Sequence, residues 1–546
     1  MFKKTKTSEA TLFESPSMLL TGRALKKYDD PKAWHNQFYE NVTCNIKEET
    51  FVPLYVDSNM GRSNASIRQL VAIMIMKEGN RRSDEQMFEA VDFDLLVRKA
   101  LGLMNISDKA PSLDTYYLFR RRIVEYEQET GKNLLNECFK DVTKAQAVTF
   151  NVEGKSIRMD SKLIGSNIAK YSRYRLILST LQQWAKTGSE RLNHKLRKRL
   201  APYLDEDAQK TEYRSTIDEV QKRLKTVGAL IYDILRHTKA GKDSTLYRVF
   251  YEQYDFVEGK AELRDKTEIS AKSVQNHNDP DAHYREKGDQ QVKGFSVNAT
   301  ETNDEGGSPS LITDVQVKPA SAADKDFLQP AVEASAEITG NLPEHINADG
   351  AYQSEDNRNF AQDNLIDFVT TGLQGKPSRY DLSMDGDTLI VTDKSTGMKI
   401  PAIKVKDKWR ITTEGKAKYR YITQEEIEKA RLRKKLESIP KKELDRRNNV
   451  EAAMFQISFH TRNNKTRYRG LSKHIMWACS RCMWINFIRL VNYQTKAFQR
   501  TLFWAFSSLF QGLCGVFRPL SEIYRPTSYI FVRQAGGPYR PLFSLT

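Results

Sequence analysis

Three acidic residues of this sequence have the types and setting needed for chemistry on a phosphodiester bond: Asp160, Asp349 and Glu451. That chemistry requires an activated oxygen nucleophile, a stabilised leaving oxygen and neutralisation of charge on the phosphate. Two Mg²⁺ ions about 4 Å apart can supply all three. Because Mg²⁺ prefers hard oxygen ligands and keeps some of its water, a few convergent carboxylates suffice. These acids are therefore candidate catalytic residues and metal ligands, with Mn²⁺ as a substitute ion.

The expected elements around the three acids favour this interpretation. Asp160 and Asp349 each end a stretch that has the pattern of a strand, and in an open α/β sheet ligands gather near the carboxyl ends of strands. Glu451 lies on an expected helix, which can pack over such a sheet. Between residues 441 and 470 there are eight Lys/Arg and three Asp/Glu, a net charge of +5. Such a neighbourhood suits DNA phosphates beside the metal ions.

Each acid also has an ordinary structural interpretation. Asp349 and Gly350 could form only a turn, as Asp385 and Gly386 are expected to do. Asp160 could cap a loop, and Glu451 could pair with Arg447, four residues earlier on the same helix. The residues by themselves leave both interpretations open.

Composition points to a polyanionic partner. The 546 residues include 86 Lys+Arg and 70 Asp+Glu, a formal charge of +16 with a pI near 9.3. So basic a chain usually meets a polyanion, and nucleic acid is the first candidate; a basic protein without such a partner is the alternative. With 39% hydrophobic and 29% charged residues, a soluble globular protein of two to four domains is expected.

Cysteine usage and hydropathy argue against other classes. Five cysteines are too few and too scattered for a disulfide framework. Cys479 and Cys482 form a C-x-x-C, but there is no second pair for a zinc site and the local pattern is helical. The N-terminus lacks the apolar core of a signal peptide. Residues 501–517 are uncharged but at the lower length limit of a span, so we expect a packing helix and no membrane role.

The N-terminal region is expected to be helical. Residues 66–126 carry apolar residues at three- and four-residue spacing, with Ser83 as a helix N-cap and Gly102 as a stop. The last of these helices carries Arg120, Arg121 and Arg122 together. Short helices with basic residues on the last one suit a DNA-binding module; a helical dimerisation or support domain is the alternative.

Strand and helix patterns alternate further along the chain. Residues 148–160 have an extended pattern, and 167–265 form a long helical region whose charge run indicates a solvated helix face or a contact with a phosphate backbone. Two strands, a helix over 323–338, a short strand "HINAD", a helix capped by Ser354 and a strand "LIDFVTTG" follow, so a βαβ-like unit with a parallel pair is expected. Residues 379–422 have the pattern of short antiparallel strands. A charge-rich helix, broken at Pro440, and a helix over about 441–459 come next.

Three motifs resemble those of a known family. "MDSKLIGSN" around Asp160 resembles the first-Asp motif of the DDE transposases of bacterial insertion sequences, and "INADGAYQSEDN" around Asp349 resembles the second. "RRNNVEAAMFQISFHTRNNKTRYRG" resembles the third, in which an Arg precedes the catalytic Glu by four residues, as Arg447 precedes Glu451. The helical stretch from residue 83 to residue 123 is also similar, so the resemblance covers about residues 60–490 and places three motifs in family order.

The resemblance implies an α/β fold: a ribonuclease-H-like mixed sheet flanked by helices and preceded by an all-helical N-terminal domain. The implied domains are a helical DNA-binding domain (1–145), a catalytic domain (146–490) and a basic, aromatic tail (491–546). The catalytic domain would contain a helical insertion at about 167–285 and a β-rich insertion at about 376–440.

The resemblance also implies a reaction and partners. The expected activity is metal-dependent cleavage and strand transfer of an insertion sequence, with Asp160, Asp349 and Glu451 holding two Mg²⁺ ions. The expected partners are double-stranded DNA with terminal inverted repeats, target DNA and a second copy of the chain in a homodimer. The expected location is the bacterial cytoplasm, at the nucleoid.

Basic residues and one aromatic residue are the expected DNA contacts. Trp409, in the β-rich insertion, is the candidate to stack on a displaced base, although it could instead form the core of a small sheet. The expected basic contacts are Arg120, Arg121, Arg122, Arg447, Arg462, Lys465 and Arg467.

The third motif departs from the family at two positions. The family usually has Tyr three residues before the Arg and Lys seven residues after the Glu, where this sequence has Leu444 and Ser458. Arg462, near the same helix face as Glu451, can substitute for the missing Lys. The departures leave two alternatives: a ribonuclease-H-like nuclease that cuts without joining strands, and an inactive derivative that binds DNA without cutting it.

Overall fold

The computed structural model covers the whole chain and describes most of it. The described residues are 2–5, 8–11, 13–55, 63–239, 241–257, 260–288, 290–304, 307–370, 378–413, 418–438, 451–459 and 461–513. The chain divides into two compact units, Met1–Val491 and Asn492–Thr546. The first unit contains all the described candidate residues.

The described part of the first 150 residues folds into helices and loops, which confirms the helices expected over residues 66–126. Side-chain caps set several helix starts: Ser83 accepts from the backbone N–H of Gln86 at 3.1 Å, and the Gln86 side chain accepts in return from the Ser83 N–H. The helices are α1 (Pro16–Leu19), α2 (Gly22–Asp29), α3 (Trp34–Asn41), η1 (Thr43–Asn45), η2 (Glu48–Leu54), α4 (Ile67–Asn80), α5 (Asp84–Phe93), α6 (Leu95–Ala100), α7 (Leu113–Thr130) and α8 (Leu134–Thr149).

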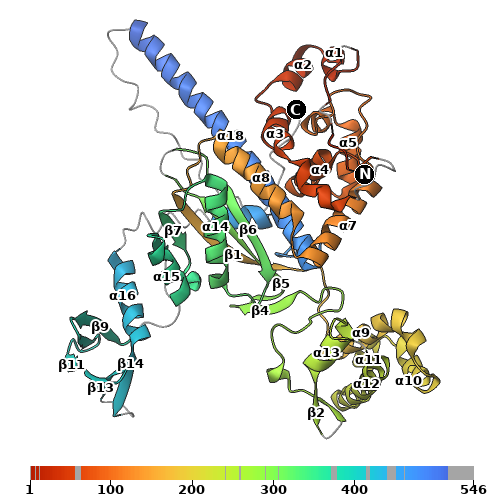
Figure 1. Ribbon diagram of the computed structural model, residues 1–546, viewed down its shortest axis with the longest axis vertical. Helices are drawn as coiled ribbons and strands as arrows, with labels where there is room; N and C mark the ends of the chain where they lie inside the picture. Colours follow the sequence, from red (N-terminus) through yellow and green to blue (C-terminus); the bar gives the residue numbers. More distant parts are fainter. Residues whose placement is uncertain are drawn as a thin grey trace. The chain divides into compact units, whose positions relative to one another are not determined.

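A mixed sheet forms the centre of the first unit (Figure 1). Its strands are β1 (Ser156–Gly165), β4 (His283–Lys287), β5 (Gln290–Thr302), β6 (Ile312–Pro319), β7 (His345–Ala348) and β8 (Asp367–Thr370). Strand β5 pairs antiparallel with β4, β6 and β1, whereas β7 and β8 continue the sheet parallel to β1. Among the five strands in the order β6-β5-β1-β7-β8, β5 alone runs opposite to the others.

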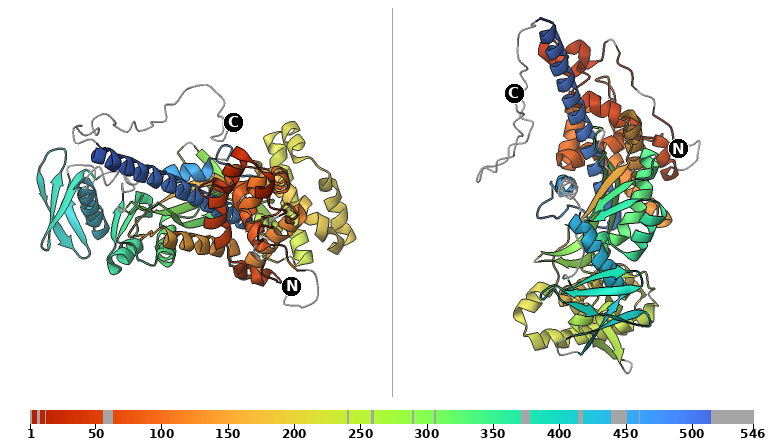
Figure 2. Two further views of the ribbon diagram at one scale, coloured as in Figure 1. Left: turned by 90° about the horizontal axis from the view of Figure 1, so that it is seen from above. Right: turned by 90° about the vertical axis from the view of Figure 1, so that its left-hand side faces the viewer.

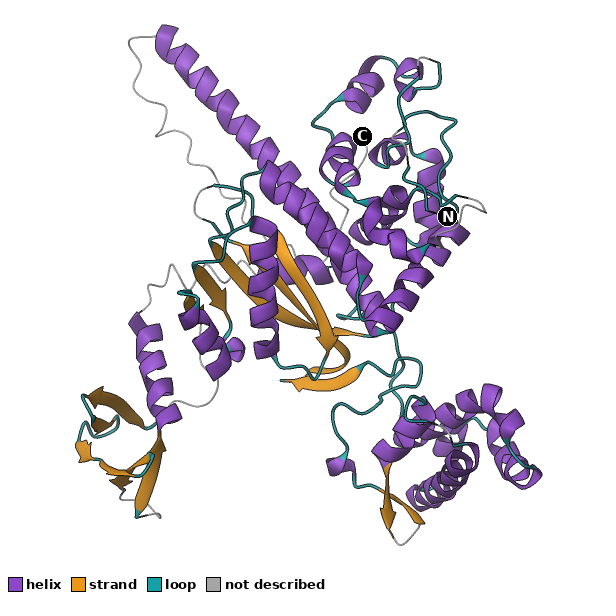
Figure 3. Ribbon diagram, in the orientation of Figure 1, coloured by secondary structure: helices purple, strands orange, loops and turns teal. Residues whose placement is uncertain are grey.

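Helices cover both faces of this sheet, as Figure 3 shows. On one face, Ile157 and Met159 of β1 pack with residues of α14 (Leu328–Thr339), which follows η5 (Asp324–Phe327), and of α15 (Glu355–Asp363). On the other face, Ile164 shares a core with the N-terminal helices and with the first part of α18 (Leu471–Leu513). The N-terminal helices and the sheet therefore share one hydrophobic core.

The insertion after β1 folds around a core of its own. Its elements are α9 (Arg173–Gly188), η3 (Ser189–Arg191), α10 (His194–Leu204), α11 (Ala208–Arg214), α12 (Ile217–Thr238), α13 (Thr245–Gln253), the hairpin β2 (Tyr254–Val257) and β3 (Lys260–Leu263), and η4 (Lys266–Glu268). A Thr216–Glu219 capping box begins α12, the longest of these helices.

Two three-stranded sheets and a helix follow β8 (Figure 2). One consists of β9 (Tyr380–Asp385), β10 (Thr388–Asp393) and β11 (Lys399–Pro401), and the other of β12 (Ile403–Val405), β13 (Lys408–Thr412) and β14 (Tyr419–Thr423). Both contribute to one core, together with Ile427 of α16 (Gln424–Ser438). Gly386 has φ of +55°, the left-handed conformation that a tight hairpin turn favours.

The structure confirms a mixed α/β architecture with a helical N-terminal region and the parallel pair β7–β8. The expected hairpin is present, but its turn residues are Gly386 and Asp387, one position later than expected, because Asp385 still pairs with Thr388. Two expectations are wrong. Strand β1 starts at Ser156 and continues to Gly165, because β5 pairs with it along its whole length, so Asp160 lies in mid-strand. The long helical region ends at Gln253, where the β2–β3 hairpin begins.

Candidate functional site

Asp160 lies within β1, and Asp349 directly follows β7, the parallel neighbour of β1. Arg158 of β1 pairs with Asn347 of β7, and each acid lies two residues further along its chain. Neighbouring strands lie about 4.8 Å apart, so this register, continued by two residues, sets the two backbones side by side. The Asp160 carboxylate accepts from the Ser161 N–H at 2.8 Å, and Asp349 accepts from the Gly350 N–H at 2.6 Å. Both acids are half-buried.

A buried tyrosine lies within electrostatic reach of both carboxylates. The Tyr352 hydroxyl donates to Asn298 Oδ1 at 2.6 Å. Its pKa is raised well above the usual value, first by burial and then by the charges of Asp160, Asp324 and Asp349. The sequence predicts a role for neither Tyr352 nor Asp324. Tyr352 belongs to the second motif, which is a usable signal, whereas nothing in the local sequence singles out Asp324.

Lys162 connects β1 to the helical residues 451–458. Side chains alternate along a strand, so Asp160 and Lys162 project from the same face of the sheet. Lys162 Nζ donates to Ser458 Oγ at 2.7 Å, and burial lowers the pKa of the ammonium group. Ala453, Met454, Ile457 and Ser458 of this helix are buried, and Met454 and Ile457 belong to the same hydrophobic core as Ile164 of β1.

Glu451 lies on the same edge of this helix as Ser458, because seven residues make about two turns. Contacts occur in the same order along both segments: after Lys162 and Ser458, the Gly165 N–H donates to Asn464 O at 2.7 Å. These contacts join the C-terminal end of the helix, and the loop that follows it, to β1. The Glu451 side chain itself is exposed.

The donor types suit Mg²⁺, since all three are carboxylates. Within the described residues, however, no group of three or more His, Cys, Asp or Glu side chains is gathered closely enough to hold a metal ion. Asp160 lies in β1, Asp349 directly after β7, and Glu451 on a helix that contacts β1 through Ser458, but the three side chains are not gathered around one point. Arg447 and Leu444 lie outside the described residues.

The loop after this helix forms one wall of a basic cleft of about 570 Å³. The other wall belongs to the N-terminal helices and includes Arg81 and Glu78. Lys465 is fixed by its Nζ, which donates to Ile168 O at 2.5 Å, and Arg467 donates to Arg82 O at 3.1 Å. The expected DNA contacts that line this cleft are Arg462, Lys465 and Arg467. The expectation that Arg462 shares a helix face with Glu451 is wrong, because the helical residues end at Ser458 and Arg462 lies in the loop.

The three arginines of α7 lie in different environments. Arg120 packs between two rings, 5.3 Å from Tyr116 and 5.4 Å from Tyr468, whereas Arg121 is exposed and Arg122 lies over Tyr55. Their contact with DNA stays a prediction.

Arg120 belongs to a buried charged cluster that joins the N-terminal helices to the chain after residue 465. Lys77 is only 1% exposed, forms ion pairs with Glu78 and Asp84, and its Nζ lies 3.1 Å from the Tyr468 hydroxyl. Tyr468 in turn donates to Glu78. The cluster ties α4 to the wall of the basic cleft.

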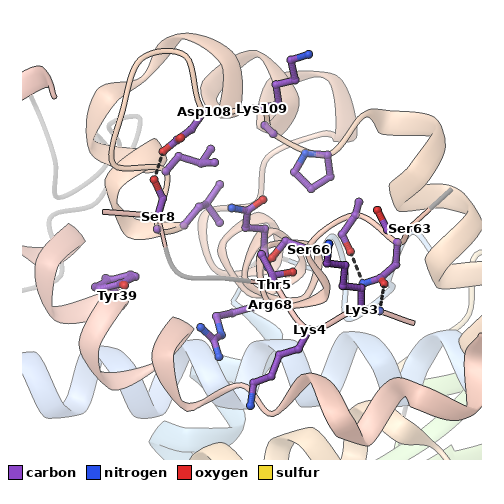
Figure 4. Close-up of a pocket in the computed structure, with 18 residues that line it drawn as sticks. Lys3, Lys4, Thr5, Ser8, Tyr39, Ser63, Ser66, Arg68, Asp108 and Lys109 are labelled. Atoms are coloured by element: carbon purple, nitrogen blue, oxygen red, sulfur yellow. Dashed lines mark hydrogen bonds between the residues drawn. The ribbon is translucent and has the colours of Figure 1, made fainter. Parts of the chain in front are cut away.

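A second basic cleft, of about 590 Å³, lies within the N-terminal region. Figure 4 shows Lys3, Lys4 and Arg68 on one side of it and the Ser8–Asp108 pair on another. The Ser8 hydroxyl donates to Asp108 at 2.6 Å, and Lys4 forms an ion pair with Glu49 at 2.5 Å.

Trp409 is only 7% exposed and lies in the core of the β-rich region. Lys404 Nζ stands 5.7 Å from the centre of its ring. This placement favours the packing alternative for Trp409 over base stacking. Cys479 and Cys482 are buried on α18, within the main core, as the helical pattern of the C-x-x-C indicates.

The comparisons with known proteins bear on the N-terminal region. Residues 29–122 match the family model described as Transposase domain (DUF772). This match supports a transposase function for the chain. Transposases act on DNA, which agrees with the net charge of +16 and with the basic clefts beside α4. No curated protein and no solved structure matches the chain. In the described part of the chain, no helix has both the length and the apolar character needed to cross a membrane.

Proposed function

We propose that this chain is a DDE transposase that cleaves the ends of an insertion sequence and joins them to target DNA. The observation that carries the proposal is the pairing of β1 with β7. Its register, continued by two residues, would bring Asp160 level with Asp349, and Lys162, on the same face of β1 as Asp160, contacts Ser458 of the helix that bears Glu451. The match of residues 29–122 to a transposase domain supports it independently.

The proposal includes a ribonuclease-H-like fold for the central sheet. The strand order β6-β5-β1-β7-β8, with β5 alone antiparallel, supports this assignment. In such a sheet a carboxylate on the central strand and another just after its parallel neighbour lie close together, where ligands gather in open α/β sheets.

Asp160, Asp349 and Glu451 would hold two Mg²⁺ ions, which supply activation of the attacking oxygen and stabilisation of the leaving oxygen. Glu451 must turn towards β1 for this role, and its exposed position leaves it free to do so. Lys162 provides a cation beside Ser458, the position where the third motif lacks its usual lysine. Arg462, Lys465 and Arg467 would neutralise phosphates of the DNA end in the basic cleft.

The test uses duplexes that carry the ends of the DNA flanking the coding sequence. With Mg²⁺ or Mn²⁺ the purified chain should nick these ends and then join them to a plasmid, and EDTA should stop both steps. Replacement of Asp349 by Asn should abolish nicking and leave duplex binding nearly unchanged. Nicking that persists in Asp349→Asn would remove Asp349 from the site.

The two alternatives give different results in the same assay. A nuclease would nick the duplex but never join it to the plasmid. An inactive DNA-binding derivative would shift the duplex in a gel without nicking it in either metal. The buried Ser458 in the third motif is the observation that favours this second alternative.

A further inference from the structure

A third basic cleft, of about 480 Å³, lies where the helical insertion meets β4 and β5. Its walls come from the residues that lead into α9, from residues 266–275 and from the two strands. Its lining includes none of the three acids and none of residues 29–122, although Lys170 follows the first acidic motif closely in sequence. Neither the proposed chemistry nor the family match gives it a role.

The charged side chains that line this cleft are all cationic. The cationic side chains that line it are Lys170, Arg173, Lys266 and Lys293, and none of the described residues in its lining is Asp or Glu. Arg173 is oriented by Gln253, which accepts from Nε at 2.8 Å and from a terminal nitrogen at 2.7 Å. Two acids close to the cleft in sequence have partners of their own: Asp265 caps η4, and Glu286 accepts from the Tyr284 hydroxyl.

Two lysines in the cleft repel each other. Lys293 is half-buried, and its pKa is lowered by burial first and by the charge of Lys170 second. No described carboxylate offsets these two effects. Like charges held together beside a cavity are stabilised by an anion that enters it, because each then gains an opposite charge.

The surrounding sequence extends the positive charge. Residues 167–199 contain nine Lys/Arg and one acid, a net charge of +8 in 33 residues. A free phosphate ion needs only the cleft, whereas a polyanion also gains from such an extended positive region. Two tyrosines, Tyr171 and Tyr284, also line the cleft and provide flat surfaces beside the cations.

We propose that this cleft binds a phosphate group of a DNA backbone, so that the helical insertion is a DNA-binding element separate from the acidic motifs. The inference rests on the proposed function in one respect, that the chain binds DNA. Lys170 and Lys293 are the principal contacts, with Arg173 held in place beside them by Gln253.

The test compares the full chain with a double variant, Lys170→Gln/Lys293→Gln, on a duplex of fixed sequence over a range of salt concentrations. Log affinity falls linearly with log salt, and each lost phosphate contact reduces the magnitude of this negative slope by about 0.9. The double variant should therefore bind more weakly and with a slope smaller by about 1 to 2. Lys225→Gln/Lys260→Gln removes the same charge from exposed positions of the insertion outside the cleft and should have a smaller effect.

A second measurement needs no variant. Duplex DNA should protect Lys170 and Lys293 from an amine-modifying reagent in the wild-type chain, whereas inorganic phosphate at the same phosphate concentration should not. Protection by inorganic phosphate alone would identify a free-anion site and overturn the DNA assignment. If the wild-type chain binds DNA, but the double variant has the same salt slope and DNA protects neither lysine, the assignment of the cleft as a DNA site is wrong. The proposed function would then still stand. A wild-type chain that binds no DNA would overturn both.

Discussion

The contact between Lys162 and Ser458 gives the sharpest structural prediction, because it joins the strand of Asp160 to the helix of Glu451. The two residues are 296 positions apart in sequence, and the Nζ–Oγ distance is 2.7 Å. Lys162→Met keeps the apolar stem of the side chain and removes the ammonium group, whereas Ser458→Ala removes only the hydroxyl. If the contact holds the helix on β1, the two substitutions should not act independently.

The expected coupling follows from the chemistry of the bond. A hydrogen bond that involves a charged group contributes about 1.5–3 kcal/mol. Lys162 is only half-buried, so screening by solvent reduces this to about 1 kcal/mol. A change of about 1 kcal/mol corresponds to about a fivefold change in an opening equilibrium. The singles and the double variant therefore form a cycle with a measurable coupling.

Hydrogen exchange of the backbone amides in residues 451–458 is the suitable assay, since it reports local opening in a large chain without requiring two-state unfolding. Each single variant should speed exchange there, and the double should be little faster than the more affected single. Lys155→Met, at an exposed lysine just before β1, should leave these amides unchanged. Effects of the two substitutions that add to within about 0.4 kcal/mol would refute the contact.

Three further predictions test the frame around the site. Trp409→Ala should unfold the β-rich region, because removing a buried Trp costs about 3–5 kcal/mol. Proteolysis within residues 378–438 would show the unfolding, and unchanged protease resistance would contradict the packing role. Gly294→Ala should disrupt β1–β5 pairing and lower the soluble yield, because a Cβ at this position would lie 2.2 Å from Ile164 O. At the control position Gly241, a Cβ would have no atom within 4 Å, so Gly241→Ala should behave as wild type. Burial raises the pKa of Asp314 from 3.8 to about 6, so the folded state binds a proton more tightly than the unfolded state. Protonated Asp314 therefore stabilises the folded state below about pH 4. This contribution to the free energy of unfolding, about 3 kcal/mol, is lost as the pH rises through 6. Exchange of β5 and β6 amides in wild type should therefore speed up, relative to Asp314→Asn, between pH 4 and 7, and parallel pH profiles would contradict this.

Elements governed by local chemistry were predictable from the sequence. Ser83, Ser112 and Ser354 begin helices because each side chain accepts from a backbone N–H three residues later, which the sequence alone indicates. The hairpin around Gly386 and the β7–α15–β8 unit follow from turn residues and short apolar runs in the same way.

Features that depend on distant partners were not predictable. The length of β1 is set by β5, which pairs with it from Ile157 to Gly165, so the local pattern ends the strand too early. Lys77 lies in an apolar helix, yet it is buried because Glu78, Asp84 and Tyr468 surround its charge. Lys162 was missed for the same reason, although its position two residues after Asp160 sets it on the same strand face.

The most direct test of the proposed metal-dependent cleavage is the rate of nicking of repeat-end DNA by Asp160→Asn, with Asp385→Asn as a matched control. Asp385 is the exposed last residue of β9, just before the turn at Gly386 and Asp387, a position that Asn also suits. The account predicts that Asp160→Asn binds the duplex with nearly wild-type affinity but nicks none of it in Mg²⁺, while Asp385→Asn nicks at the wild-type rate. Nicking by Asp160→Asn at the wild-type rate would contradict the account.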